Sequence, residues 1–190
     1  MVSSTRLKNK VQEVLEPLVK ELKVSPNVIT VLGFIFSLLS GVFIGIESLN
    51  VGILFFVLSG LCDMLDGIVA RINGKTTKFG AFLDSFLDRY ADFFPLMGLA
   101  VLGFYKQDFV LFFFSLLSIV GSFSTSYARA RAEGLGLDCK VGILERPERF
   151  FLILFGLVSG LLHYTLFILA ILSNITAFQR LLYVWGKLKE

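Results

Sequence analysis

Four aspartates occupy helical spacings in two mainly apolar segments of the chain that a short basic loop joins. Asp63 and Asp66 stand at i and i+3, and Asp84 and Asp88 stand at i and i+4, so each pair occupies one face of a helix. A charged side chain at the centre of a membrane helix costs about 2.5–3.5 kcal/mol on insertion scales, and unpaired carboxylates also repel one another. Divalent cations offset such a cluster, and ligands that offer only oxygen favour Mg²⁺ or Mn²⁺ over zinc.

Small and cationic residues accompany the aspartates. Gly67 and Ala70 continue the face of the first pair, and Gly80 begins the face of the second, which leaves room for a ligand beside the carboxylates. Arg71, one turn after Gly67, presents a planar fork that suits a phosphate or diphosphate. Two metal ions, small neighbours and an arginine together predict a diphosphate clamp for phosphoryl-type transfer.

Two other interpretations of the aspartates compete with this one. In the first, they form a buried ionic network with nearby basic residues: Arg71, Lys75, Lys78 and Arg89. That network requires lysines at the membrane edge to leave water in order to serve four aspartates. In the second, the carboxylates belong to a cation or proton transporter. A transporter favours acidic residues near the bilayer midplane, whereas these lie near one end of their helices.

Membrane-spanning helices are the elements that hold these residues. Hydrophobic residues make up 55% of the 190-residue chain, which excludes an ordinary soluble domain. A helix needs about 20 apolar residues to cross the hydrocarbon. The sequence therefore predicts an all-α integral membrane protein, a single domain over residues 1–190 with six spans: 27–46, 51–72, 80–103, 108–131, 148–163 and 165–186. A short basic loop joins the second span to the third, so we expect these two helices to be antiparallel neighbours with opposed acidic faces.

Basic residues mark the cytoplasmic side. The expected connections at 47–50, 106–108 and 163–165 hold few of them, while lysines and arginines gather at the opposite helix ends and near both termini. The positive-inside rule places both termini in the cytoplasm, as an even number of spans requires. Residues 1–24 carry apolar side chains at helical spacing between charges, which indicates an amphipathic helix. It either lies on the membrane surface or packs on the cytoplasmic face of the bundle formed by residues 25–190.

The aspartate stretch fits the pattern D-x2-D-G-x2-A-R-x8-G-x3-D-x3-D without a departure over 26 residues. In this the chain resembles the CDP-alcohol phosphatidyltransferase family, whose members have six membrane helices and usually form homodimers. The resemblance implies that Asp63, Asp66, Asp84 and Asp88 bind two Mg²⁺ ions, for which Mn²⁺ substitutes, and that Asp88 is also the general base. It further implies a multi-pass protein of the cell membrane whose active site faces the cytoplasm.

The same resemblance assigns a CDP-activated lipid to a second set of residues. These lie at the start of the first span and beside the aspartates: Pro26, Asn27, Val28, Ile29, Gly67, Ala70, Arg71 and Thr77. Simple helix capping explains the start of the first span equally well, because Ser25 suits the N-cap and Pro26 the first helical position. The implied reaction is attack of an acceptor hydroxyl on the lipid-bearing phosphorus with release of CMP. The expected partners are the substrates and membrane lipids, and nucleic acid is not expected among them.

A group of arginines bears on the identity of the acceptor. Two stand at the cytoplasmic ends of the fourth and fifth spans, and Arg180 lies within the sixth, where an unpaired charge is costly. An acceptor that carries its own phosphate explains them, whereas serine, choline or inositol does not need them. These segments resemble those of phosphatidylinositol phosphate and archaetidylinositol phosphate synthases, which implies that Arg129, Arg146 and Arg180 bind the phosphate of inositol 1-phosphate. Glycerol 3-phosphate remains the alternative acceptor, and no residue distinguishes diacylglycerol from archaeol tails.

Three further charged residues lie near these groups. The positive-inside rule explains Arg131 and Arg149 as well as a binding role does. Asp92 lies one turn beyond Asp88 on the same helix face, outside the pattern. We expect Asp92 either to support the metal ligands or to pair with an arginine of the acceptor pocket.

Overall fold

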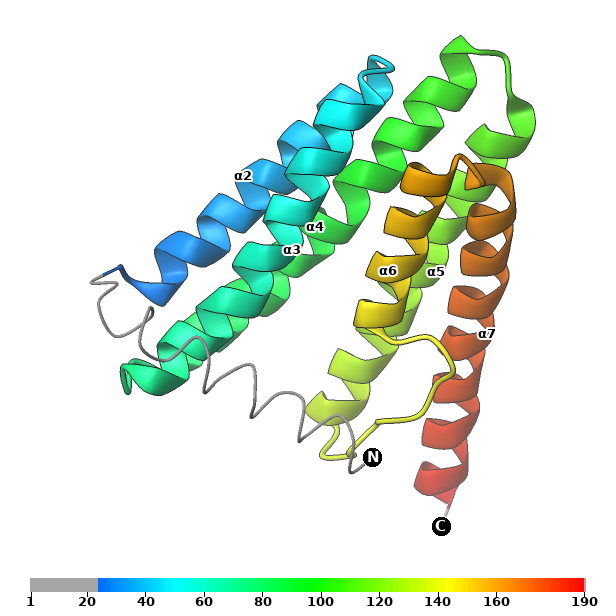
Figure 1. The fold of residues 1–190 in the computed structure, drawn as a ribbon. Coiled ribbons are helices and arrows are strands. Elements are labelled where there is room, and N and C mark those ends of the chain that lie inside the picture. The colour runs from blue at the N-terminus through cyan, green and yellow to red at the C-terminus, as the bar shows by residue number, and fades with distance from the viewer. Residues whose placement is uncertain (1–23, 190) are drawn as a thin grey trace.

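The computed structural model describes residues 24–189, and the regular structure in this range is entirely helical. The expected amphipathic helix at 1–24 lies outside the described residues apart from Val24. Successive helices alternate in direction, with short connections at one end of the bundle and the 73–77 and 135–145 segments at the other (Figure 1). The helices are α2 (Pro26–Gly45), α3 (Leu49–Ile72), α4 (Lys78–Tyr105), α5 (Phe109–Gly134), α6 (Arg146–Ser159) and α7 (Leu162–Lys189).

Four of these helices, α2, α3, α5 and α7, combine the length and apolar composition needed to cross a membrane. The 28 residues of α4 are long enough, but several charges lie between its start and its middle, among them Asp84, Asp88 and Asp92. The 14 residues of α6 are fewer than the about 20 that a straight span needs. The all-α prediction is confirmed, and four apolar helices of span length fit an integral membrane protein.

The connection between α6 and α7 comes earlier than the sequence predicted. Helix α6 ends at Ser159 and α7 begins at Leu162, whereas the break was expected at 163–165. Gly160 ends α6 in a left-handed conformation with φ of 74°, which glycine adopts without the steric cost of a Cβ. The flanking residues are Ser159 and Leu161, so no cluster of polar residues marks the break in the sequence.

Helix α2 packs along both α3 and α4, while α5 packs along α7 and also along α4. Helix α6 lies against α7 and touches α3, where the rings of Phe56 and Phe150 stack with their centroids 4.4 Å apart. The antiparallel course of α3 and α4 agrees with the sequence prediction (Figure 1). Their direct packing is slight, however, because α2 packs against both of them.

Glycines set the spacing between α2 and α4. A Cβ added at Gly98 would lie 2.3 Å from the carbonyl oxygen of Gly41, and one added at Gly41 would lie 2.4 Å from that of Phe94. Small residues let the backbones of membrane helices approach closely in this way. The contact fixes the position of α4, which carries half of the aspartate pattern.

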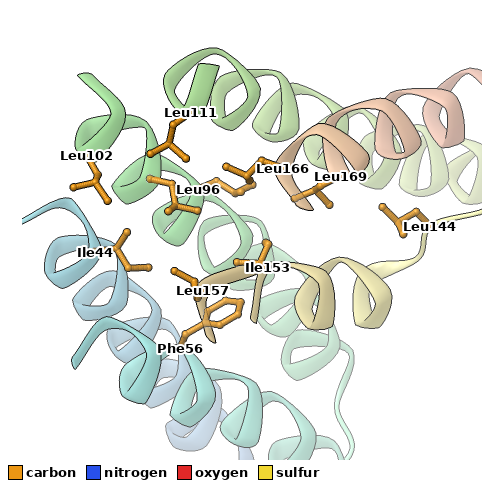
Figure 2. Packing of buried hydrophobic residues seen from close by; sticks show 11 residues of the cluster. Ile44, Phe56, Leu96, Leu102, Leu111, Leu144, Ile153, Leu157, Leu166 and Leu169 are labelled. Carbon is orange, nitrogen blue, oxygen red and sulfur yellow. The ribbon is translucent and has the colours of Figure 1, made fainter. Parts of the chain in front are cut away.

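Every helix contributes buried side chains to one apolar cluster, which Figure 2 shows pointing toward a common centre. Its members lie mainly toward the end of the bundle with the short connections, as in Ile44, Leu102 and Leu111. Buried hydroxyls join the helices as well: Ser40 Oγ donates to the Gly52 carbonyl at 2.9 Å. This cluster therefore holds one end of the bundle together, while a much smaller cluster around Ile68 and Val69 of α3 packs at the aspartate end.

Candidate active site

Three aspartates from two helices converge near the end of the bundle where residues 73–77 connect α3 to α4. Asp63 of α3 and Asp84 and Asp88 of α4 each offer one carboxylate oxygen, and these oxygens all lie within 4.8 Å of one another. All three residues are partly buried. Carboxylates this close repel one another unless positive charge lies between them, and oxygen donors suit hard divalent ions. The donor set therefore fits Mg²⁺ or Mn²⁺.

Asp66, the fourth expected metal ligand, lines a small pocket that Asp63, Asp88 and Arg146 also line. It is only 5% exposed, and its Oδ2 accepts a 2.6 Å hydrogen bond from Thr30 Oγ1 of α2. Thr30 therefore fixes the direction of this carboxylate. Sequence analysis missed Thr30 because a hydroxyl within an apolar helix most simply bonds its own backbone, and Thr30 does also bond the Pro26 carbonyl.

Arg146, expected in the acceptor pocket, lies against two of the aspartates. Its Nη1 donates to Asp63 Oδ1 at 2.6 Å and lies 2.8 Å from Asp88 Oδ2. Arg146 is the first residue of α6, and Pro147 follows it at a position where proline suits the start of a helix. The beginning of α6 thus brings a cation to the carboxylates of α3 and α4.

Asp92 faces two arginines of α6. Its Oδ1 lies 3.4 Å from Arg146 Nε, and its Oδ2 accepts a hydrogen bond from Arg149 Nη2 at 2.8 Å. Of the two roles expected for Asp92, the structure confirms the pairing with Arg146. Within residues 24–189, the ion pairs of the site aspartates run to Arg146 and Arg149 and not to Arg71, Lys75, Lys78 or Arg89. Arg89, one of the partners in the alternative ionic network, lies within electrostatic reach of Asp84, Asp88 and Asp92 without a direct ion pair among the described residues.

The residues expected to contact CDP lie around the starts of α2 and α4 and the end of α3. Thr77 is the N-cap of α4, and its Oγ1 accepts a hydrogen bond from the Gly80 N–H at 2.9 Å. A Cβ at Gly80 would lie 3.2 Å from Asn27 Oδ1, so the start of α2 adjoins the start of α4. A Cβ at Gly67 would lie 3.4 Å from Arg71 Nη1, so the guanidinium adjoins this glycine.

The remaining expected CDP contacts differ in their surroundings. Pro26 is buried at the first position of α2, and Val28 is 50% exposed. Ile29 packs against the buried pair Ile68 and Val69, and Ala70 is partly buried. Residue 25 occupies the N-cap of α2 without a side-chain hydrogen bond, so the capping explanation holds for the proline alone.

Arg129 and Arg180, the other expected phosphate ligands, are held in different ways. Arg180 is 3% exposed within α7, and its Nε and Nη1 donate to the carbonyls of Val141 and Thr125, each at 2.8 Å. These bonds account for a buried arginine in an apolar helix. Arg129 lies on α5, partly exposed, and donates from Nε to Glu133 Oε1 at 2.9 Å.

Electrostatic contacts join these two arginines to the start of α6. Arg180 lies within electrostatic reach of Arg129 and of Arg149. Glu145, which directly precedes Arg146, lies within reach of both Arg129 and Arg180. The structure thus gathers the ends of α5, α6 and α7 into one neighbourhood, in which Arg146 is the member that touches the aspartates.

The chain belongs to the CDP-alcohol phosphatidyltransferase family, whose family model matches residues 23–183. It is 36% identical over 185 residues to an archaetidylinositol phosphate synthase of Methanothermobacter thermautotrophicus, covering 94% of this chain and 92% of that protein. A crystal structure of Mycobacterium tuberculosis phosphatidylinositol phosphate synthase with CDP-DAG bound has a TM-score of 0.80 at 34% identity, covering 95% of this chain and 94% of that one. The same enzyme with manganese and citrate has a TM-score of 0.81 at 32% identity, covering 94% and 88%.

Family membership decides between the interpretations that the sequence left open. The chain is an enzyme, a transferase of phospholipid biosynthesis, and not a cation or proton transporter. The aspartates that converge from α3 and α4 are those that carried the family resemblance. Neighbours named inositol phosphate synthases further agree with the resemblance seen in the arginine segments.

Proposed function

We propose that this enzyme transfers a phosphatidyl-type phosphate from a CDP-activated lipid to the hydroxyl of inositol 1-phosphate and releases CMP. The convergence of Asp63, Asp84 and Asp88, with carboxylate oxygens within 4.8 Å of one another, carries this proposal. Arg146 adds a cation at the same place. Relatives named archaetidylinositol phosphate synthase, and a neighbour crystallised with CDP-DAG, support the two substrates.

The carboxylates of Asp63, Asp66, Asp84 and Asp88 hold two Mg²⁺ ions in this proposal, and Mn²⁺ substitutes for them. The neighbour crystallised with manganese supports a divalent ion here. Bound cations of this kind offset the charge of the diphosphate and the charge that develops as the bond to CMP breaks. Thr30 contributes by holding Asp66 in one direction.

Asp88 is the general base. It takes the proton from the acceptor hydroxyl, which attacks the phosphorus that carries the lipid, and CMP departs. Asp88 also ligates metal in this proposal, so its carboxylate orients the hydroxyl as well as accepting the proton. The CDP moiety binds along the neighbouring surface formed by Pro26, Asn27, Val28, Ile29, Gly67, Ala70, Arg71 and Thr77.

The phosphate of the acceptor binds to Arg129, Arg146 and Arg180. Within residues 24–189, the hydrogen bonds of Arg180 occupy Nε and Nη1, and those of Arg146 occupy the same two atoms, which leaves Nη2 of each for a phosphate. Glycerol 3-phosphate is the second candidate, because its phosphate suits the same arginines. Diacylglycerol and archaeol lipids fit the proposal equally well.

In this proposal all six helices pass through the bilayer, although the 14 residues of α6 cover less of its thickness than a straight span of about 20, and both termini and the active site face the cytoplasm. The alternating course of the helices and the basic residues at the aspartate end support this orientation. The lipid then stays in the cell membrane while the polar acceptor arrives from the cytoplasm. The working form is a homodimer.

An acceptor panel tests the proposal. Purified protein in detergent is given CDP-diacylglycerol or CDP-archaeol with Mg²⁺, and CMP release is followed with inositol 1-phosphate, glycerol 3-phosphate, serine or inositol. We expect inositol 1-phosphate to be the best acceptor. The proposal fails if inositol or serine competes better, while a preference for glycerol 3-phosphate keeps the phosphate pocket and selects the second candidate.

A further inference from the structure

Asp92 joins two helices that otherwise pack little against each other. It lies on α4, and both of its carboxylate oxygens face the first turn of α6, where Arg146 and Arg149 stand three residues apart. Among residues 24–189, α6 packs mainly on α7 and α3. The first turn of α6 is therefore oriented toward α4 by two carboxylates, Asp88, which contacts Arg146 alone, and Asp92, which contacts both arginines.

Arg149 anchors Asp92. Its side chain is 4% exposed, and its Nη2 donates to Asp92 Oδ2 at 2.8 Å. Its Nε is buried without a hydrogen-bond partner among the described residues, so Asp92 is the main compensation for this charge. Removing one member of a buried pair is costly because it leaves an uncompensated charge, so Arg149 and Asp92 favour staying in contact. The other oxygen of Asp92 is thereby held toward Arg146.

Arg146 is then held at two points of its planar fork. Nη1 contacts Asp63 and Asp88, and Nε faces Asp92 Oδ1 at 3.4 Å. A guanidinium is flat and rigid, so fixing Nε and Nη1 also fixes the direction in which Nη2 donates. Without Asp92, the carboxylates of Asp63 and Asp88 alone would hold the group, and it would be free to pivot about Nη1.

We propose that Asp92 is a positioning residue for the acceptor: held by Arg149, it directs Arg146 so that Nη2 meets the incoming phosphate. The inference rests on the proposed function, because the role of Arg146 in acceptor binding belongs to that function. Asp92 itself touches neither substrate. Its loss is therefore felt in the use of the acceptor and hardly in the use of the CDP-lipid.

Kinetics of Asp92→Asn test the inference. Partners that orient metal ligands typically contribute about 10- to 100-fold, and we expect an effect at the low end of this range here, a rise of about 10-fold in the acceptor KM. The KM for CDP-lipid should stay nearly unchanged, and Asp92→Glu should recover part of the loss. The shift in thermal unfolding that inositol 1-phosphate produces, measured without CDP-lipid, should weaken in parallel.

A double-mutant cycle distinguishes positioning from a separate effect. If Asp92 acts through Arg146, then Asp92→Asn adds nothing to the acceptor KM of Arg146→Ala. Additive effects in the doubly substituted protein would overturn the inference. So would an unchanged acceptor KM in Asp92→Asn.

Loss of the fold is controlled with a matched variant. Asp92→Asn leaves the charge of Arg149 buried and unpaired, whereas Asp92→Asn combined with Arg149→Met removes both charges of the pair. We expect the combined variant to regain thermal stability and to keep the raised acceptor KM. A normal acceptor KM in this stable variant would assign Asp92 to the fold alone. If the unmodified enzyme prefers an acceptor without phosphate, both the proposed function and this inference are wrong. If the unmodified enzyme uses inositol 1-phosphate and the Asp92 variant has a normal acceptor KM, only this inference is wrong.

Discussion

The two ends of the helix bundle handle charge in opposite ways. At the end with the short connections, the ionisable groups of the described residues form one-to-one contacts: Lys106 pairs with Glu47, and His163 Nε2 lies 2.6 Å from Asp108 Oδ2. At the other end, Asp63, Asp88 and Asp92 share the guanidinium of Arg146, Arg149 pairs with Asp92 alone, and Asp84 adds a further carboxylate. One-to-one pairs tie connections together, whereas an excess of negative charge requires cations from outside the chain. The imbalance marks the end at which the chemistry takes place.

Removal of divalent cations should have the largest effect. At the aspartate end, the carboxylates outnumber the arginine that they share, so we expect exhaustive chelation to abolish CMP release and added Mg²⁺ or Mn²⁺ to restore it. The end with the short connections needs no ion, so stabilisation by Mg²⁺ should come from the aspartate end. Added Mg²⁺ should therefore raise the midpoint of thermal unfolding less in Asp63→Asn than in the unmodified protein. Full activity after chelation would contradict the prediction that the aspartate end needs divalent cations.

Asp88→Asn should nearly abolish turnover and leave CDP-lipid binding largely intact. The amide cannot accept the proton of the acceptor hydroxyl, and general-base catalysis contributes about 10²- to 10⁴-fold. Asp63, Asp66, Asp84 and Arg71 still hold the diphosphate. Rates of CMP release are compared with direct binding of the CDP-lipid. Unmodified turnover in this variant would refute the assignment of the base.

Arg180→Ala and Arg129→Ala should weaken acceptor use by roughly 10- to 150-fold, because a hydrogen bond to a charged group contributes about 1.5–3 kcal/mol. Their effects on stability should differ. Arg180 is buried and bonds two backbone carbonyls, so its loss should also lower the midpoint of thermal unfolding. Arg129 is partly exposed, and its loss should not. Normal acceptor kinetics in both variants would contradict the assignment of Arg129 and Arg180 to a phosphate pocket.

At the end with the short connections, Asp108→Ala should lower the free energy of unfolding by about 1 kcal/mol, the usual contribution of an N-cap. It should leave CMP release unchanged. The backbone N–H of Leu111 bonds the Asp108 carboxylate at 3.0 Å and, together with His163, lowers its pKa. A carboxyl group whose pKa is lowered by folding stabilises the protein above its unfolded pKa of about 3.9, and this contribution disappears as the pH falls through the folded value.

The difference between Asp108→Ala and the unmodified protein should therefore shrink in acid. Thermal unfolding at neutral pH and below about pH 4 measures it. Asp108→Ser is the control, because it keeps an N-cap oxygen without the charge. A destabilisation by Asp108→Ala that is larger below about pH 4 than at neutral pH would contradict this prediction.

Lys106→Met should have the smallest effect. Its pair with Glu47 is exposed, and pairs of this kind contribute about 0–1 kcal/mol. We expect unfolding to change little and CMP release not at all. A loss of activity comparable to that of the arginine variants would show that the two ends are coupled rather than distinct.

The sequence by itself determined the helices and the grouping of the aspartates on them. Helical periodicity is local, so spacings of three and four residues place Asp63 with Asp66, and Asp84 with Asp88, whatever the rest of the fold does. The expected spans match the first four of the six described helices closely for the same reason, and the last two differ mainly at the break between them. The exception is the break at Gly160, where a backbone conformation rather than a polar cluster ends the helix.

Only the tertiary structure decided which side chains meet the aspartates. Arg146 reaches Asp63 across 83 positions of sequence, and Thr30 reaches Asp66 across 36. From the sequence, several arginines at the same end of the bundle could pair with the aspartates equally well. The packing of α6 against α7 and α3 brings Arg146 and Arg149 to them. Contacts between helices depend on how whole faces pack, and no local spacing encodes that.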